Sequence, residues 1–192
     1  ELKNFSFLNS VNLNFRNTNN FLLDLSGSLF EDTLVVNIRQ DAVVELNLSN
    51  CIFKKGFTIT SNTVRTKVIA IQSKAFNDVN LDNSRFALLN FEKFHLIDDL
   101  DNYYFYFNDS VVYDSISFKE ANLSNLNFTK SFYKCDANFD GIKLKSAEFY
   151  NTTFNENLYF NGAEFRSNIF LNGSLFNKTV IFYNCNKDIS ES

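Results

Sequence analysis

Residues 111–185 read VVYDSISFKEANLSNLNFTKSFYKCDANFDGIKLKSAEFYNTTFNENLYFNGAEFRSNIFLNGSLFNKTVIFYNC, and a bulky apolar residue returns at every fifth position of this segment. The phase slips by one residue after Tyr133 and again after Phe154. A small or aliphatic residue stands two positions before most members of the series, and polar residues fill the remaining positions. The members are Phe118, Leu123, Phe128, Tyr133, Phe139, Leu144, Phe149, Phe154, Phe160, Phe165, Phe170, Leu175, Val180 and Cys185.

A period of five fits neither an α-helix, which repeats every 3.6 residues, nor a flat strand, which repeats every two. A short fixed period instead indicates a solenoid, in which each repeat buries its apolar residue against the copies above and below. If each five-residue unit forms one side of a square, four units close a coil of about 20 residues. We expect the large residue and its small partner to point inward, and successive coils to stack at about 4.8 Å.

The units AEFYN (147–151), AEFRS (163–167), ANLSN (121–125) and ANFDG (137–141) resemble those of the pentapeptide-repeat proteins. The resemblance implies an all-β fold, a right-handed parallel β-helix with four sides. Lys178 and Tyr183 depart from the pattern, because they occupy places where the family has a small residue.

The composition favours one domain over residues 1–192. Forty-five per cent of the residues are hydrophobic, and the 24 Phe are explained by a Phe-filled interior. The absence of Pro and the presence of only five Gly argue against flexible linkers. Coils of about 20 residues predict about nine coils and a rod of about 45 Å. No apolar run has the ~20 residues of a membrane span and no signal peptide is present, so we expect no membrane segment and a cytoplasmic location.

The five-residue phase varies along the chain. It is faint over residues 1–45, which we interpret as degenerate coils with an N-terminal cap, and it breaks at 59–68 (ITSNTVRTKV) and at 97–110 (IDDLDNYYFYFNDS). The three-residue spacing of Phe91, Phe94, Ile97 and Leu100 leaves a short helix as an alternative at the start of the second interruption. Between the two interruptions we expect these residues to point inward: Ile71, Phe76, Leu81, Phe86, Phe91 and Leu96, with Lys74, Val79, Ser84, Leu89 and Phe94 among their partners.

The sequence offers little for catalysis. Its one histidine, His95, falls in an outward place, and the common serine-hydrolase, phosphate-loop and zinc motifs are absent. Asp98, Asp99 and Asp101 could form an acidic glycan-cleaving site, but a solvated acidic turn is the simpler interpretation. The three cysteines lack a CxxC pair, so we expect free thiols, with Cys51 and Cys185 buried. We predict no enzymatic activity, no metal and no cofactor.

Unusual charges and aromatic residues gather near the interruptions. Residues 98–120 carry six acids and one base, residues 46–77 carry five bases and no acid, and residues 103–107 are five consecutive aromatics. Exposed aromatic residues commonly dominate protein interfaces, although packing onto the rod would also explain them. The predicted interaction residues are Tyr103, Tyr104, Tyr106, Asp98, Asp99, Asp101, Lys54, Lys55, Arg65 and Lys67.

These observations predict a non-enzymatic scaffold that binds a partner protein through its faces and interruptions. The family resemblance implies an alternative, a DNA mimic that binds a topoisomerase such as gyrase. We do not expect direct nucleic-acid binding, because acids rather than bases surround the aromatic residues. The C-terminal coil exposes an edge that must be capped or paired, so we expect a homodimer through that coil.

Overall fold

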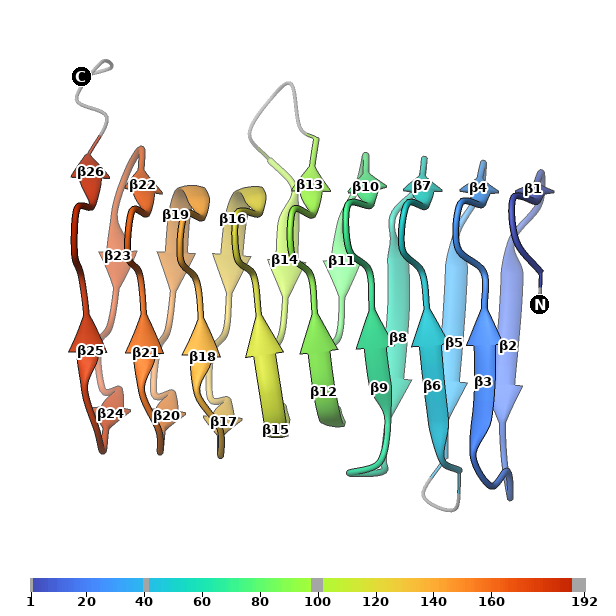
Figure 1. Cartoon of the computed structure of the whole chain (residues 1–192), viewed down its shortest axis with the longest axis horizontal. Coiled ribbons are helices and arrows are strands. Elements are labelled where there is room, and N and C mark those ends of the chain that lie inside the picture. The colour runs from blue at the N-terminus through green and yellow to red at the C-terminus, as the bar shows by residue number, and fades with distance from the viewer. Residues whose placement is uncertain (1, 40–41, 98–101, 188–192) are drawn as a thin grey trace.

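The computed structural model describes residues 2–39, 42–97 and 102–187, and it shows a parallel β-solenoid of about eight turns (Figure 1). Within these residues every regular element is a strand, and no helix is long and apolar enough to cross a membrane. Strands β3, β6 and β9 run upward at the front of Figure 1 while β2, β5 and β8 run downward behind them, and the coils progress from right to left. This winding is right-handed, the hand that twisted parallel strands favour.

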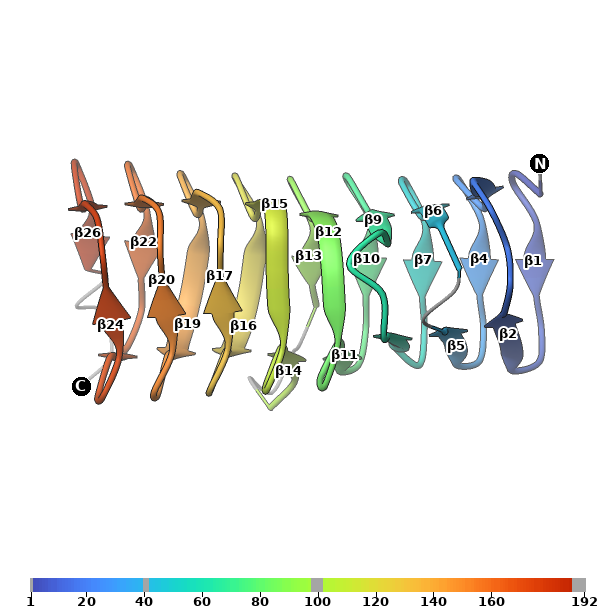
Figure 2. The same cartoon turned by 90° about the horizontal axis from the view of Figure 1, so that it is seen from below.

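Four ladders of strands, which we name faces A to D in chain order, form the sides of the rod (Figure 2). Face A contains β1 (Ser6–Phe7), β4 (Leu29–Phe30), β7 (Ile52–Phe53), β10 (Lys74–Ala75), β13 (His95–Leu96), the first parts of β16 (Asn122–Asn127) and β19 (Lys143–Glu148), β22 (Glu164–Phe165) and β26 (Asn186–Lys187). Face B contains β2 (Val11–Phe15), β5 (Leu34–Ile38), β8 (Phe57–Ser61), β11 (Val79–Asn80), β14 (Tyr104–Tyr106), the second parts of β16 and β19, and β23 (Ile169–Phe170).

The other two faces complete each coil. Face C contains the first parts of β12 (Arg85–Asn90) and β15 (Val111–Ser117), followed by β17 (Phe132–Tyr133), β20 (Thr153–Phe154) and β24 (Leu175–Phe176). Face D contains β3 (Phe21–Asp24), β6 (Val44–Asn47), β9 (Lys67–Ile69), the second parts of β12 and β15, β18 (Ala137–Asn138), β21 (Leu158–Tyr159) and β25 (Val180–Ile181).

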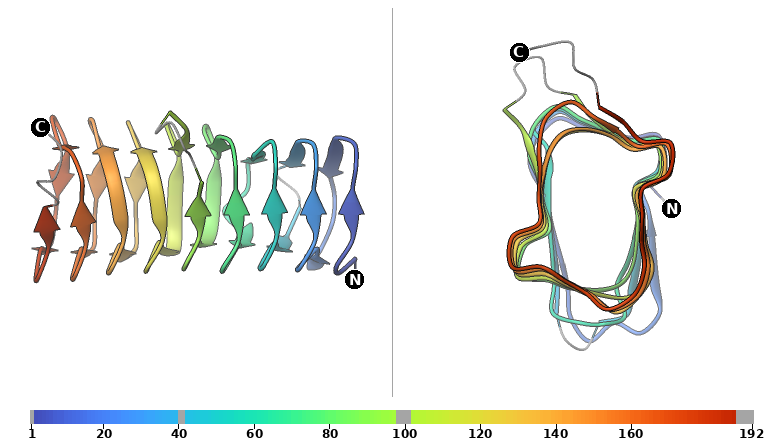
Figure 3. Two further views of the ribbon diagram at one scale, coloured as in Figure 1. Left: turned by 90° about the horizontal axis from the view of Figure 1, so that it is seen from above. Right: turned by 90° about the vertical axis from the view of Figure 1, so that its left-hand side faces the viewer.

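Each turn is longer than the 20 residues expected. Ser6 pairs with Leu29 and Leu29 with Ile52, a spacing of 23 residues. Asn122 pairs with Lys143 and Lys143 with Glu164, a spacing of 21. The one-residue slips that interrupt the five-residue phase are therefore part of the turn itself, and they account for about eight turns in place of nine. The cross-section also changes, since the N-terminal coils reach farther to one side than the C-terminal coils (Figure 3).

The interior consists largely of stacked phenylalanines, as the five-residue phase predicts. Phe118 stacks on Phe139 with ring centroids 5.5 Å apart, and Phe139 stacks on Phe160 at 5.1 Å. These spacings lie within the favourable range for aromatic pairs. Ten of the predicted inward residues are buried: Phe118, Leu123, Phe128, Tyr133, Phe139, Leu144, Phe149, Phe154, Phe160 and Phe165.

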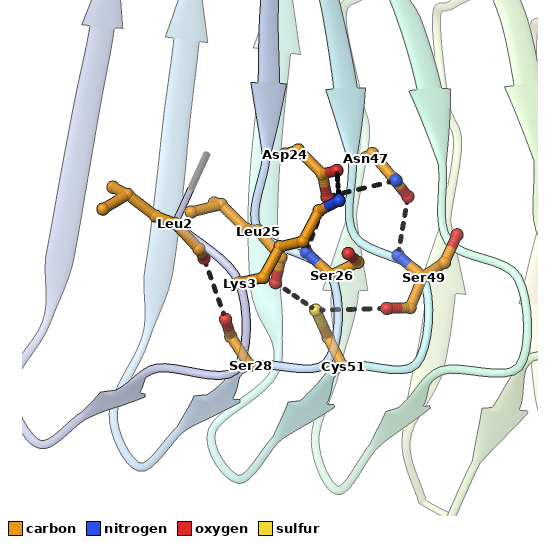
Figure 4. A network of polar contacts seen from close by, with 9 residues as sticks. All are labelled: Leu2, Lys3, Asp24, Leu25, Ser26, Ser28, Asn47, Ser49 and Cys51. Atoms are coloured by element: carbon orange, nitrogen blue, oxygen red, sulfur yellow. Dashed lines mark hydrogen bonds and ion pairs between the residues drawn. The ribbon is translucent and has the colours of Figure 1, made fainter.

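The corners before faces A and C share one backbone solution. A residue with positive φ stands directly before the small inward residue at each corner, as Gly27 does before Ser28 and Asn50 before Cys51. A polar side chain three residues earlier caps the turn: Asp24 Oδ1 accepts the Ser26 N–H and Asn47 Oδ1 the Ser49 N–H, both at 3.1 Å (Figure 4). The repeated Asn and Ser of this chain thus hold corners, where short polar side chains mimic a backbone turn.

The buried small residue then ties one coil to the next. Ser110 Oγ donates to the Leu81 carbonyl and accepts the Ser84 N–H, both at 3.0 Å. Cys51 takes the same role at a corner before face A, where its Sγ donates to the Leu25 carbonyl at 3.1 Å (Figure 4). The same inward position at the corners before face C is occupied by Ser84, Ser110, Ser131, Thr152 and Ser174.

The inward assignment of Ile71 and Phe76, with Lys74 as their small partner, is wrong. Lys74 points outward and is exposed, whereas Ser73 and Ala75 are fully buried. Residues 68–76 (VIAIQSKAF) contain two interleaved apolar sets, and a strand can bury only one of them. The neighbouring coil decides, because Ala75 pairs with the buried Phe53. The later members of this series, from Leu81 to Leu96, are buried as predicted.

The last coil also departs from the predicted phase. Phe154 pairs with Phe176, which leaves Leu175 54 % exposed, and Phe170 points outward. The reason is one additional residue after β22: Leu144 and Ala147 are three apart, whereas their partners Phe165 and Ile169 are four apart. The shift also moves Val180 and Cys185 to the places of the smaller inward residues, opposite Leu158 and Ala163.

The two expected interruptions are shorter in the structure. Strand β8 continues to Ser61 and β9 starts at Lys67, so only the corner 62–66 separates them. Within 97–110, β14 pairs with β11 and β16 as a regular rung of face B. Phe91, Phe94 and Ile97 belong to a turn and to face A, so a helix over these three residues is wrong, and Leu100 lies outside the described residues.

Candidate functional site

The outer surface of face B carries a pair of stacked tyrosines. Tyr104 and Tyr106 point outward with ring centroids 5.2 Å apart and 18° between the ring planes, while Phe105 and Phe107 are fully buried. The sequence YFYF (104–107) produces this arrangement, because side chains alternate between the two sides of a strand. Three of the five consecutive aromatics therefore serve the core in whole or in part, since Tyr103 also packs partly against it.

Carboxylates hold the backbone on either side of the tyrosines. Asp78 Oδ1 accepts the Tyr104 N–H at 2.7 Å, and Asp82 Oδ1 accepts the Asn108 N–H at 2.5 Å. Burial raises the pKa of Asp82, against the opposing effect of its bonds from Asn108. Burial also raises the pKa of Tyr106, with a further contribution from Asp78, so both tyrosine hydroxyls stay neutral donors near neutral pH.

Next to the tyrosines, towards the C-terminus, lies a flat polar strip. Register places Asn125 and Ser146 beside Tyr104, and Asn127 and Glu148 beside Tyr106. Ser146 Oγ donates to Asn125 Oδ1 at 2.7 Å, and Asn127 Nδ2 donates to Glu148 Oε2 at 3.1 Å. These mutual bonds fix the side chains in place, so the strip is preorganised.

A second aromatic pair closes the strip. Phe170 follows Glu148 in the same outward column, and its ring stacks on that of Tyr150 with centroids 5.9 Å apart. We name the surface formed by Tyr104, Tyr106, the polar strip, Tyr150 and Phe170 the face B platform. Tyr106 and Phe170 are three rungs apart, about 14 Å at the spacing of paired strands.

Sequence reasoning missed Tyr150 and Phe170. Phe170 was assigned to the interior because it continues the five-residue phase. The apolar residues Ile169 and Leu171 on either side of it were the available signal, since a strand that buries both must turn Phe170 outward.

The predicted basic residues are not gathered into one patch. Lys54 lies on face A, where its Nζ stands 5.2 Å from the Phe76 ring centroid. Lys55 is exposed at the corner that follows, and Arg65 and Lys67 border a hollow beside face D. Lys67 pairs with Glu45 at 3.7 Å.

The acidic segment is dispersed as well. Asp98, Asp99 and Asp101 lie outside the described residues. Asp109 lines a polar ledge of about 440 Å³ with Asn62, Asn83 and Arg85, and Glu120 pairs with Lys93 at 3.5 Å at a corner before face A. The interpretation of two opposed charge patches is therefore wrong, because the solenoid distributes neighbouring residues over different faces.

The reactive side chains are placed for structure. His95 points outward on face A opposite Lys74, and its pKa is lowered by burial and by that lysine. All three cysteines are free; Cys51 and Cys135 are buried and Cys185 is half-buried. In the part of the chain that the structure describes, no group of histidine, cysteine and carboxylate side chains is arranged to hold a metal ion.

Comparison with known proteins adds no relative. No family model, no curated protein and no solved structure matches this chain.

Proposed function

We propose that this solenoid is a non-enzymatic scaffold that binds an extended segment of a partner protein across the face B platform. The observation that carries the proposal is the outward Tyr104–Tyr106 stack on a face that is otherwise polar. Tyrosine is enriched among the residues that contribute most to interfaces, because it presents a large rigid surface and a hydrogen-bonding hydroxyl. The Tyr150–Phe170 pair gives the platform a second anchor at the other end of the polar strip.

The platform has the form expected of a protein interface. Two apolar anchors flank polar groups whose positions are already fixed by Ser146–Asn125 and Asn127–Glu148 bonds, so binding requires little ordering. Glu148 and the nearby Asp78 give the surface an acidic character, which favours a partner segment that carries basic residues.

A photo-crosslinking experiment tests this function. A photoreactive phenylalanine analogue in place of Tyr104 should capture one partner from the native cell extract, and the same analogue in place of Tyr159 on face D should not. The affinity of the identified partner is then measured for Tyr104→Ser/Tyr106→Ser and for the control Tyr159→Ser. We expect the double variant to weaken binding by about 30-fold or more while circular dichroism stays unchanged. Equal affinity of both variants would remove face B from the interface.

We infer further that the chain is a divergent pentapeptide-repeat solenoid. The AEFYN-like units and the inward Phe and Ala columns support this relationship. Turns of 21 to 23 residues and corners capped by Asn or Asp are its departures from a strict five-residue repeat.

DNA mimicry with a topoisomerase as partner stays a prediction from the resemblance. A mimic of a duplex needs a continuous acidic surface. Several carboxylates of this rod are instead paired with lysines on adjacent coils: Glu45 with Lys67, Glu120 with Lys93, Glu156 with Lys178 and Glu164 with Lys143.

We also propose self-association through the C-terminal coil. Leu175, Phe182 and Tyr183 are 54 %, 48 % and 66 % exposed there, and the Phe182 ring ends a phenylalanine stack that starts inside the rod. Exposed apolar side chains beside unpaired strand edges are the usual signature of a pairing surface.

A further inference from the structure

A hollow of about 180 Å³ lies beside face D near the N-terminal end of the rod, on three successive coils. Its strands β3, β6 and β9 stand side by side at the right of Figure 1. Apolar side chains form most of its wall, and charged side chains stand at its rim. The lining residues are Asn20, Phe21, Leu22, Val43, Val44, Glu45, Arg65 and Lys67.

The apolar wall is open to solvent. Phe21 is 40 % exposed and Leu22 60 % exposed, although both belong to β3 and stand next to the buried Val44. Exposed apolar groups in a concave site favour an apolar ligand group, because the hydrophobic effect rewards removal of both surfaces from water.

The rim favours a negative charge. Glu45 and Lys67 face each other in register and form an ion pair at 3.7 Å, so their charges compensate. Arg65 is exposed, and among the described residues its guanidinium forms no ion pair. Its backbone is fixed by the bond from its N–H to Thr63 Oγ1, which holds the residue at the mouth of the hollow. A guanidinium recognises a carboxylate through two parallel hydrogen bonds.

We propose that this hollow binds a peptide segment of a partner protein in which an aliphatic side chain is adjacent to a carboxylate. The aliphatic group contacts Phe21, Leu22 and Val43, and the carboxylate pairs with Arg65. A single side chain matches the size of the hollow, and the charge of Arg65 determines the acidic neighbour. The site lies on a different face from Tyr104 and Tyr106, so it stands independently of the platform on face B.

Three short peptides test both halves of the recognition. The probe is acetyl-Ala-Leu-Asp-amide; acetyl-Ala-Leu-Asn-amide lacks the carboxylate and acetyl-Ala-Ser-Asp-amide lacks the aliphatic group. Titration of the isotope-labelled chain by amide NMR should shift the signals of residues 20–22, 43–45 and 65–67, with a dissociation constant on the order of 1 mM for the probe. Each altered peptide should bind on the order of tenfold more weakly. Shifts confined to other residues, or equal binding of all three peptides, would overturn the proposal.

A variant of Arg65 separates the contact from a general effect of charge. Arg65→Gln should weaken the Asp peptide on the order of tenfold and leave the Asn peptide unchanged, because the lost interaction requires both partners. Lys54→Gln, which removes a cation on face A, should leave both affinities unchanged. Equal weakening of both peptides by Arg65→Gln contradicts the assigned pair. Octanoate carries the same chemistry without a peptide backbone; if it binds as tightly as the Asp peptide, the hollow takes small amphiphiles and the peptide proposal is wrong.

Discussion

Tyr133 places a hydroxyl inside the aromatic column. Its ring stacks between Phe107 and Phe154, with centroids at 5.9 and 4.7 Å, and the hydroxyl oxygen is buried without a hydrogen-bond partner among the described residues. Burial accordingly raises its pKa well above the usual value. A buried polar group without a partner carries a desolvation cost.

Tyr133→Phe should therefore stabilise the protein, by about 1 kcal/mol. Urea unfolding of the variant and of the control Tyr159→Phe, whose ring is only half-buried on face D, measures the difference. An unfolding midpoint lowered by Tyr133→Phe would show that the hydroxyl makes a stabilising contact.

Gly56 is the glycine least able to change. Its φ is +72°, and a Cβ at this position would stand 2.0 Å from the Asp78 carbonyl oxygen. Gly162 has φ +67° but has open space where a Cβ would lie. Gly56→Ala should cost clearly more than the ~1–2 kcal/mol of the left-handed backbone alone, and Gly162→Ala about that amount. Thermal unfolding of the two variants checks the order; equal losses would mean that the coil at Asp78 moves freely.

The buried thiols make stability depend on alkaline pH. Burial raises the pKa of Cys51 to about 11 and that of Cys135 to about 12. A thiol with a raised folded-state pKa contributes stability that is complete below its unfolded pKa of about 8.5. This stability is lost as pH rises through the folded value, because only the unfolded chain ionises in that window.

We therefore expect the free energy of unfolding to fall between about pH 9 and 11, with Cys51 contributing about 2–3 kcal/mol to the loss. Urea unfolding across this range should show a smaller slope for Cys51→Ser/Cys135→Ala than for the parent chain. The same slope in both proteins would mean that other groups, such as tyrosines, cause the decline.

At the scale of the element, the corner is the unit that repeats. Each corner combines a polar cap, a residue with positive φ and a buried hydroxyl or thiol that donates to the previous coil. The strands between corners are short, often of two residues, so the corners carry much of the directional bonding.

Ser110→Ala removes one such link. The substitution leaves the Leu81 carbonyl and the Ser84 N–H without the hydroxyl that joins them, at a buried site. We expect a loss of about 1–3 kcal/mol in the free energy of unfolding, the cost of leaving buried polar groups unpaired. Ser115→Ala, on the outer side of face D, is the matched control and should change stability by less than about 0.5 kcal/mol. Similar values for the two variants would mean that the corner hydroxyls are not structural.

At the scale of the whole molecule, every coil is stabilised by the coils on either side, and the terminal coils have only one neighbour. We expect the proposed association through the C-terminal coil to be sensitive to charge. Leu175→Glu/Phe182→Glu should convert the associated form to the monomer in light scattering, because a paired interface would bury both carboxylates. Leu22→Glu, at the opposite end, should leave the mass unchanged. A monomeric parent chain at high concentration would end this proposal.

The sequence by itself determined the architecture and most of the interior. An apolar residue at every fifth position is compatible with a stacked coil and with no single helix or flat strand, so Phe118, Phe128 and Phe139 could be placed inside without coordinates. The same reasoning located Tyr104 and Tyr106 as candidate interaction residues, because five aromatics in a row exceed the needs of a loop.

Only the tertiary structure decided which of two alternating sets faces inward where both are apolar. Ala75 rather than Phe76 is buried because Phe53 lies opposite it, and Phe170 turns outward because one additional residue precedes it. Strand register depends on the neighbouring coil, and a shift of one residue exchanges the two sides. For the same reason the Tyr150–Phe170 pair and the hollow at Arg65 are not visible in the sequence, since each joins residues about 20 or more positions apart through the stacking of coils.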